Sequence, residues 1–216
     1  MLLSIDTCGA VGTVALARRK DEGVEALALT GIAGKTYSAR LAPTIREVLA
    51  AQGARVSELV TIVVTNGPGG FTGIRIGLAT AKGLAELHGT PVIAVSRLAV
   101  LAHKAGKRAA ALDASRGEFY VGEYGTDLST GASERLLTRD HFLQLSSTLG
   151  GDLTVCETGA QALAPAATLV PPPTAMDALE YALPRVRAGA FDEAMTLDGN
   201  YLRKSDAEIF APHGRG

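Results

Sequence analysis

Apolar residues gather in short runs along the first third of the chain, and this pattern predicts three strands. Residues 2–6 and 12–17 are rich in aliphatic and β-branched side chains, and a turn of small residues joins them. Residues 24–30 form a third run of the same kind. Because consecutive strands with short connections usually pair with each other, we expect an antiparallel meander.

Helical spacing begins after the third run. Residues 37–52 place apolar side chains three and four positions apart, and Gly53 stands where a left-handed cap is needed. Pro43 is best tolerated in the first turn of a helix, so we expect this helix to begin nearer Ala42 than Tyr37.

Two continuous apolar runs, at residues 60–65 and 91–95, are typical of strands buried on both faces of a sheet. A Gly-Pro turn and a second helix separate these runs, and this strand–helix–strand order predicts parallel strands beside the meander, hence an α/β fold. In the second half of the chain we expect a hairpin of residues 109–113 and 118–124, a short helix at 140–145 and a strand at 153–156. A long helix at 175–188, interrupted by Pro184, would follow.

We place a boundary between two lobes at residues 95–104. This boundary gives an N-terminal domain over residues 1–100, which carries the helices described above, and a C-terminal domain over residues 101–216. We expect the last segment of the second domain to pack back on the first.

The helix that starts at Phe71 is apolar nearly all the way round. At about 100° per residue, one face collects Ile74, Leu78, Ala81 and Ala85. The opposite face, which we call the second face, collects Thr72, Ile76, Ala79, Thr80, Gly83 and Leu87. Such a helix is either sandwiched inside a core or docked against a partner, and the pattern alone leaves both readings open.

Composition argues against nucleic-acid binding by the chain alone and against a membrane protein. The 21 basic and 22 acidic residues give a net charge of −1, which argues against a protein that grips nucleic acid by itself. No apolar run approaches the ~20 residues needed to span a bilayer, and the first residues look like a strand rather than a signal peptide. We therefore expect a cytoplasmic protein without membrane contact.

A glycine-rich segment follows the strand at residues 60–65. Residues 66–77 read Asn-Gly-Pro-Gly-Gly-Phe-Thr-Gly-Ile-Arg-Ile-Gly, a strand–turn–helix geometry that cradles phosphate in other proteins. A Walker loop would need Lys-Ser or Lys-Thr after its last glycine, and Ile74 and Arg75 stand there instead. A structural turn is the favoured reading, and a nucleotide loop is the alternative.

Residues that could carry catalysis or metal are sparse. The histidines His88, His103, His141 and His213 form no HxxxH or HExxH pair, which favours surface or capping roles. Cys8 and Cys156 lack metal-site spacing, and Cys8 is better explained as a half-buried thiol than as a nucleophile. Asp6 and Asp113 each end a strand before a turn of small residues, where they would either hold Mg²⁺ against phosphates or bond their own backbone.

Four segments carry a resemblance that spans nearly the whole chain. They are Ser-Ile-Asp-Thr at residues 4–7, the Gly-Pro segment at 67–77, Asp-Ala-Ser-Arg-Gly-Glu at 113–118 and Tyr-Leu-Arg at 201–203. In this order they resemble TsaB (YeaZ), a bacterial family needed to make threonylcarbamoyladenosine in tRNA. The resemblance implies an ASKHA (actin, hexokinase, heat-shock ATPase-like) fold of two ribonuclease-H-like lobes.

The resemblance also implies a non-catalytic paralogue of TsaD, the catalytic subunit, whose first helix carries a metal-binding histidine pair. The corresponding helix here, starting at residues 35–41, has no histidine, so we expect no catalytic residue and no metal. Departures from the family pattern are Cys8 and Gly70, where serine is usual, and Tyr37-Ser38-Ala39, where His-Ser-Glu is usual.

Partners follow from the same resemblance. It implies pairing through the first two helices with TsaD, or with a second copy when the chain is alone, together with TsaE in the complex and tRNA only through the complex. We expect ATP or ADP only at the interface with these partners. The implied docking residues are Tyr37, Leu41, Ile45, Thr72, Arg75, Ile76, Ala79, Thr80, Gly83 and Leu87, and the implied vestigial nucleotide loop comprises Asp6, Thr7, Gly67, Gly69 and Gly70.

Two rival functions remain at this stage. One is a peptidase-like enzyme that acts on TsaD, which the lack of a Ser/His/Asp order argues against. The other is a small ASKHA-type kinase, which would need tight nucleotide binding.

Overall fold

The first sheet of the molecule places the first strand of the chain at its centre. The computed structural model describes residues 1–125 and 133–203. The strands of this sheet are β1 (Leu2–Asp6), β2 (Val11–Arg19), β3 (Val24–Ala33), β4 (Thr61–Thr65) and β5 (Val92–Val95). They lie in the order β3-β2-β1-β4-β5, with β1 to β3 antiparallel and β4 and β5 parallel to β1. The predicted meander with parallel strands beside it is confirmed.

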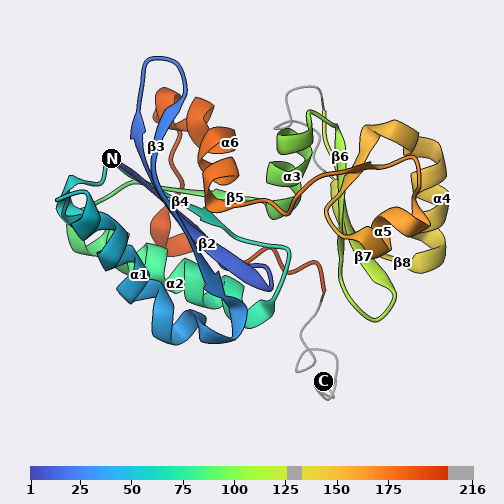
Figure 1. Ribbon diagram of the computed structural model, residues 1–216, viewed down its shortest axis with the longest axis horizontal. Helices are drawn as coiled ribbons and strands as arrows, with labels where there is room; N and C mark the ends of the chain where they lie inside the picture. The colour runs from blue at the N-terminus through green and yellow to red at the C-terminus, as the bar shows by residue number, and fades with distance from the viewer. Residues whose placement is uncertain (126–132, 204–216) are drawn as a thin grey trace, which may run out of the picture.

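Helices cover both faces of this sheet. Helices α1 (Tyr37–Ala51) and α2 (Phe71–His88) lie on one face, and the late helix α6 (Ala175–Ala188) lies on the other (Figure 1). The alternation of strand side chains explains both layers: Leu3 and Ile5 pack toward α1 and α2, whereas Leu2 packs toward α6.

The second sheet repeats this plan. Its strands are β6 (Ala109–Asp113), β7 (Glu118–Glu123), β8 (Ser133–Thr138), β9 (Leu153–Val155) and β10 (Thr168–Leu169). The strand order is β10-β9-β6-β7-β8, and read from β8 it is third-second-first-fourth-fifth, as in the first sheet. Strands β6 to β8 are antiparallel, and β9 and β10 are parallel to β6. Helices α4 (Arg139–Leu149) and α5 (Thr158–Leu163) cover one face, and α3 (Arg97–Ala105) covers the other.

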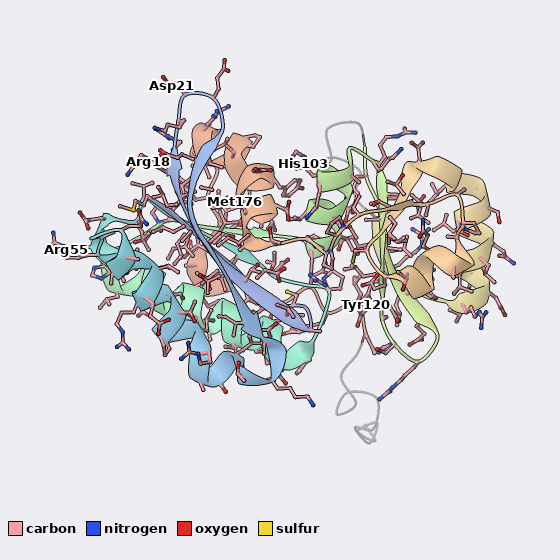
Figure 2. All side chains as sticks on the ribbon, viewed as in Figure 1. Arg18, Asp21, Arg55, His103, Tyr120 and Met176 are labelled. Carbon is pink, nitrogen blue, oxygen red and sulfur yellow. The ribbon has the colours of Figure 1, made fainter. Side chains whose placement is uncertain are left out.

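Helices α3 and α6 meet between the two lobes. The Lys104 ammonium lies 2.9 Å from the Asp177 carboxylate, and the rings of His103 and Tyr181 meet edge-on with centroids 5.5 Å apart. Figure 2 shows His103 on α3 beside α6, which carries Met176. The chain therefore crosses from the first lobe to the second through α3 and returns through α6.

Two expectations about proline are wrong. Helix α1 begins at Tyr37, not near Ala42, and Pro43 lies inside it. The reason is that the Tyr37 hydroxyl donates a 2.7 Å hydrogen bond to the Gly9 carbonyl, which holds the first turn against the β1–β2 turn. Helix α6 likewise runs without a break through Pro184.

Several elements escaped the sequence pattern, namely α3, α5, β8 and β10. Helix α3 lies where we placed an inter-lobe boundary, at residues 95–104. Its capping is nevertheless legible in the sequence: the Ser96 hydroxyl accepts from the amides of Leu98 and Ala99, and Gly106 ends the helix at φ 62°.

Candidate functional site

The residues of the predicted nucleotide loop do come together, at the ends of β1 and β4. They pack tightly against each other, and Gly69 and Gly70 also border the cavity between the lobes that is described below. A Cβ atom on Gly69 would lie 2.3 Å from the Cys8 carbonyl oxygen, and the amide of Gly70 already donates to that oxygen at 2.8 Å. Gly67 has φ +113°, in the region that favours glycine.

Contacts with Thr7 leave room only for glycine at two further positions of this segment. The Thr7 hydroxyl donates to the Gly73 carbonyl at 2.7 Å, and Cβ atoms on Gly73 and Gly77 would lie 2.0 and 2.3 Å from Thr7 oxygens. These glycines allow α2 to lie directly on the end of β1. The glycine-rich pattern is therefore accounted for by backbone packing.

Asp6 is buried, with 1% of its surface exposed, and both of its carboxylate oxygens are engaged. One oxygen accepts from the Cys8 amide at 2.9 Å and the Thr65 hydroxyl at 2.8 Å, and the other lies 3.4 Å from Nε of Arg97. Burial lowers the pKa of Arg97, but the charge of Asp6 together with smaller contributions from neighbouring groups such as Glu157 outweighs burial, so that the pKa is raised overall. This arrangement does not fit a Mg²⁺–phosphate site, because a metal would have to displace protein donors already bonded to Asp6.

Asp113 occupies the equivalent position in the second lobe, at the end of β6. Its carboxylate accepts from the Ser115 amide at 2.7 Å, two residues along the chain, as Asp6 does from Cys8. Both aspartates thus form turns with their own backbone, which is the second of the two roles considered from the sequence.

A cavity of about 710 Å³ lies between the lobes, and we call it the inter-lobe cleft. Its lining includes Gly69 and Arg97 from the first lobe and Tyr120 and Glu157 from the second. Tyr120 is labelled in Figure 2 on the second lobe, on the side that faces the first. One carboxylate oxygen of Glu157 is buried without a hydrogen-bond partner among the described residues.

The thiol of Cys8 borders this cleft but is not prepared for nucleophilic attack. It is 3% exposed and lies 3.4 Å from the Thr65 hydroxyl. Burial, reinforced by the Asp6 carboxylate, raises the pKa of the thiol to about 12, so it stays protonated at neutral pH.

The second face of α2 lies open. Thr72, Ala79, Gly83 and Leu87 are exposed, Leu87 by 71%. Among the described residues, a Cβ atom on Gly83 would have no neighbour within 4 Å. No element within residues 1–125 and 133–203 covers this face, although Ile76 and Thr80 at its edge are half-buried and Ile76 packs against the core. The opposite face, with Ile74, Leu78, Ala81 and Ala85, is buried, as predicted.

An apolar groove of about 360 Å³ lies beside this face, between α1 and α2. Ile45, Leu49, Thr80 and Leu84 are among the residues that line it. Its lining is mostly apolar, and the polar residues in it are Arg46, Arg55 and Thr80.

Three of the expected docking residues are buried in the free chain and do not lie on its surface. Tyr37, Leu41 and Ile45 are 4%, 1% and 3% exposed, because they form the stripe of α1 that packs on the sheet. Ile45 alone also lines the groove. Tyr37 and Leu41 instead hold α1 in place.

The first turn of α2 makes contacts that the sequence did not indicate. The Arg75 guanidinium stacks on the Phe71 ring at 4.0 Å from its centroid, and the Phe71 ring meets Tyr201 at 4.7 Å between centroids. These three side chains, with Lys82, line a surface cavity of about 580 Å³. This surface cavity is formed by segments far apart in sequence, so no local sequence pattern predicted it.

The histidines do not converge. His88 ends α2, His103 packs on Tyr181 and His141 shares a 3.1 Å hydrogen bond with the Thr138 hydroxyl, while His213 lies outside the described residues. Across residues 1–125 and 133–203, no group of three metal-ligating side chains is placed to hold an ion. Over the same residues, no helix has the length and apolar character to cross a bilayer.

Comparison with known proteins gives a consistent result. Residues 30–181 match the model of the TsaD family, tRNA N6-adenosine threonylcarbamoyltransferase. The chain is 34% identical over 128 residues to the tRNA threonylcarbamoyladenosine biosynthesis protein TsaB of Haemophilus influenzae, covering 56% of this chain and 52% of that one. It is 36% identical over 127 residues to TsaB of Bacillus subtilis, covering 57% and 54%. The matched region thus spans about half the length of these relatives.

Solved structures cover more of the chain. A Pseudomonas aeruginosa protein described as similar to the peptidase YeaZ superposes with a TM-score of 0.72 at 29% identity, over 94% of this chain and 99% of that one. YeaZ from Pseudomonas aeruginosa superposes with a TM-score of 0.70 at 28% identity, over 92% and 98%. With the two sheets of matching strand order, these similarities confirm the predicted ASKHA-type fold.

Proposed function

Because this chain belongs to the TsaB (YeaZ) family and matches the TsaD family model over most of its length, we propose that it takes part in the synthesis of threonylcarbamoyladenosine in tRNA. Its part is that of a non-catalytic subunit. It docks on TsaD and holds that catalytic subunit in an active arrangement.

The observation that carries this proposal is the open second face of α2. A helix whose two opposite sides are both apolar or small has one side too many for a single chain to bury. Ala79 has only a methyl group and Gly83 has no side chain, so a partner helix can approach closely, and the apolar groove beside them adds concave surface.

The inter-lobe cleft supports the non-catalytic part of the proposal. In a kinase of this fold, an acid at the end of β1 would be available to a metal–nucleotide, but here Asp6 is neutralised by Arg97. The Cys8 thiol is protonated and buried, which disfavours the peptidase-like alternative. ATP or ADP would then bind only at the interface with partner subunits.

The same surface serves more than one partner in turn. A second copy of the chain covers the α2 face when TsaD is absent, and TsaD replaces it in the complex. TsaE joins the complex, and tRNA reaches the chain only through it, as the net charge of −1 leads us to expect.

The test is reconstitution of tRNA modification with TsaD, with and without this chain, and with the variant Gly83→Glu. Because a Cβ at Gly83 meets nothing within 4 Å, the free chain tolerates glutamate and even gains up to about 1 kcal/mol of helix propensity. In a dry helix–helix contact the unpaired carboxylate costs about 3–5 kcal/mol. We expect modification, TsaD binding and homodimer formation all to be lost while the thermal melt is unchanged or raised.

Gly159→Glu is the matched control, since Gly159 is also an exposed helical glycine with no neighbour within 4 Å but lies on α5 of the second lobe. It should leave modification intact. Normal modification and TsaD binding by Gly83→Glu would show that the α2 face is not the docking surface. Modification that proceeds equally well without this chain would remove the proposed function itself.

A further inference from the structure

The last described residues of the chain, 198–203, touch both lobes, and we call them the inter-lobe strap. Figure 1 shows this segment, at the red end of the described chain, passing from the first lobe toward the second. On the first lobe, the Asn200 amide donates to the Asn66 carbonyl at 2.7 Å, and the Asn66 side chain donates to the Asp198 carbonyl at 3.4 Å. Asn66 directly follows β4.

The same strap bonds to the second lobe through side chains. The side-chain amide of Asn200 donates to the Glu134 carboxylate on β8. The other oxygen of that carboxylate accepts from the Tyr124 hydroxyl at 2.6 Å. Arg203 forms an ion pair with Glu118 on β7. The two side chains of this pair are only 23% and 32% exposed, so solvent screens them less than a typical surface pair.

Two neighbouring residues of the strap pack into different lobes. Tyr201 packs against the core of the first lobe and Leu202 against the core between α3 and the second sheet. Since a single peptide bond joins these two anchors, the strap has no slack. A change in the angle between the lobes must break one set of contacts.

The strap also touches the helix that carries the proposed docking face. Phe71, the first residue of α2, meets Tyr201 with 4.7 Å between ring centroids, and Arg75 stacks on Phe71 from the next turn. A continuous stack therefore runs from the exposed Arg75 through Phe71 to the strap.

We propose that the inter-lobe strap is a lock that fixes the orientation of the two lobes, and that a partner docked on α2 tightens it through the Arg75–Phe71–Tyr201 stack. The lock itself is a property of the free chain, whereas its tightening rests on the proposed function. Coupling of this kind is reciprocal: if docking stabilises the strap by some factor, opening the strap weakens docking by the same factor.

The lock is tested on the free chain with Arg203→Gln and its matched control Arg135→Gln. Both substitutions remove an arginine paired with a β7 carboxylate, Glu118 in one case and Glu123 in the other, but only Arg203 ties the strap to the second lobe. Hydrogen exchange at the backbone amide of Asn200 reports how often the strap opens, because that amide donates to the Asn66 carbonyl on the first lobe. We expect exchange about tenfold faster in Arg203→Gln and changed by less than about twofold in Arg135→Gln.

Equal exchange in the two variants would overturn the lock. The tightening is then tested by adding TsaD, which should slow exchange at Asn200 in the unaltered chain and should bind Arg203→Gln less tightly by a similar factor. Binding of TsaD without any slowing would overturn the tightening and leave the proposed function standing. Failure of TsaD to bind would overturn the proposed function, while the comparison of the two variants would still decide the lock.

Discussion

Replacing Arg97 by methionine is expected to lower the free energy of unfolding by about 3 kcal/mol. Arg97 is 8% exposed, and its partner Asp6 is 1% exposed. Removing one member of a buried pair leaves the other charge uncompensated, which typically costs about 3–5 kcal/mol. The lower end applies here because the Cys8 amide and the Thr65 hydroxyl remain bonded to Asp6.

A second ion pair provides the contrast. Arg108 lies 2.9 Å from Asp152, closer than the 3.4 Å between Arg97 and Asp6, but its two side chains are 60% and 50% exposed. If distance decided the energy, Arg108→Met would cost more. Because solvent screens exposed charges, we expect it to cost less than about 1 kcal/mol.

The assay is urea unfolding at neutral pH, supported by thermal melts. A loss of about 3 kcal/mol corresponds to a fall in Tm of about 6–12 °C for a chain of this size. The double variant Asp6→Asn, Arg97→Met should recover most of the loss, because it removes the buried charge together with its partner. A cost for Arg97→Met no greater than that for Arg108→Met, or no recovery in the double variant, would refute the reasoning.

Two further predictions follow from the same cleft. Titration of the purified chain with ATP should show weak binding or none, because Asp6 is engaged by Arg97; a dissociation constant in the low micromolar range, on the order of −8 kcal/mol, would revive the kinase alternative. The free energy of unfolding should fall as pH rises from about 9 to 12. The unfolded chain releases the Cys8 proton near pH 9, whereas burial raises the pKa of the folded thiol to about 12. The unfolded state therefore binds fewer protons than the folded state in that window. Cys8→Ala should reduce this fall by roughly 1 kcal/mol between pH 8 and 10 in urea-unfolding measurements, and an unchanged fall would contradict the assignment.

Periodicity predicted the layers of the first lobe because those layers are set by local spacing. Ile74, Leu78 and Ala81 recur at the helical period, and the structure buries all three on the sheet. The residues of the second face of α2 were identified by the same helical spacing. The pattern could not decide whether that face was covered, since covering depends on which other elements of the chain reach it.

The docking residues on α1 were implied by the family resemblance, and the structure buries Tyr37 and Leu41 in the core of the first lobe. A helix with a single apolar stripe normally packs that stripe on its own sheet. On α2, by contrast, the small residues Ala79 and Gly83 and the apolar Leu87 stay exposed after the sheet-facing side is buried. The partner surface is therefore better predicted by surplus apolar area than by apolar positions as such.

Contacts between distant segments account for what the sequence did not predict. Arg97 meets Asp6 across 91 positions of the chain, and Arg203 meets Glu118 across 85. Arg97 has no neighbour in sequence that marks it, and the Tyr-Leu-Arg segment that contains Arg203 does not indicate its partner. Helix α3, by contrast, was missed although Ser96 and Gly106 bracket it, because a boundary between lobes was expected there.

The same aspartate turn occurs in both lobes but in different surroundings. Asp6 and Asp113 stand at the ends of the equivalent strands β1 and β6, and each accepts from the amide two residues further on. This bond depends only on the local sequence, so both lobes form it. The difference is tertiary: Asp113 is exposed, whereas Asp6 receives Arg97 from the helix that joins the lobes. A carboxylate that neutralises an arginine of its own chain stabilises the cleft and is withdrawn from ligand chemistry. On α2 of the same lobe, by contrast, Ala79, Gly83 and Leu87 remain exposed, and this is the surface on which we propose that a partner docks.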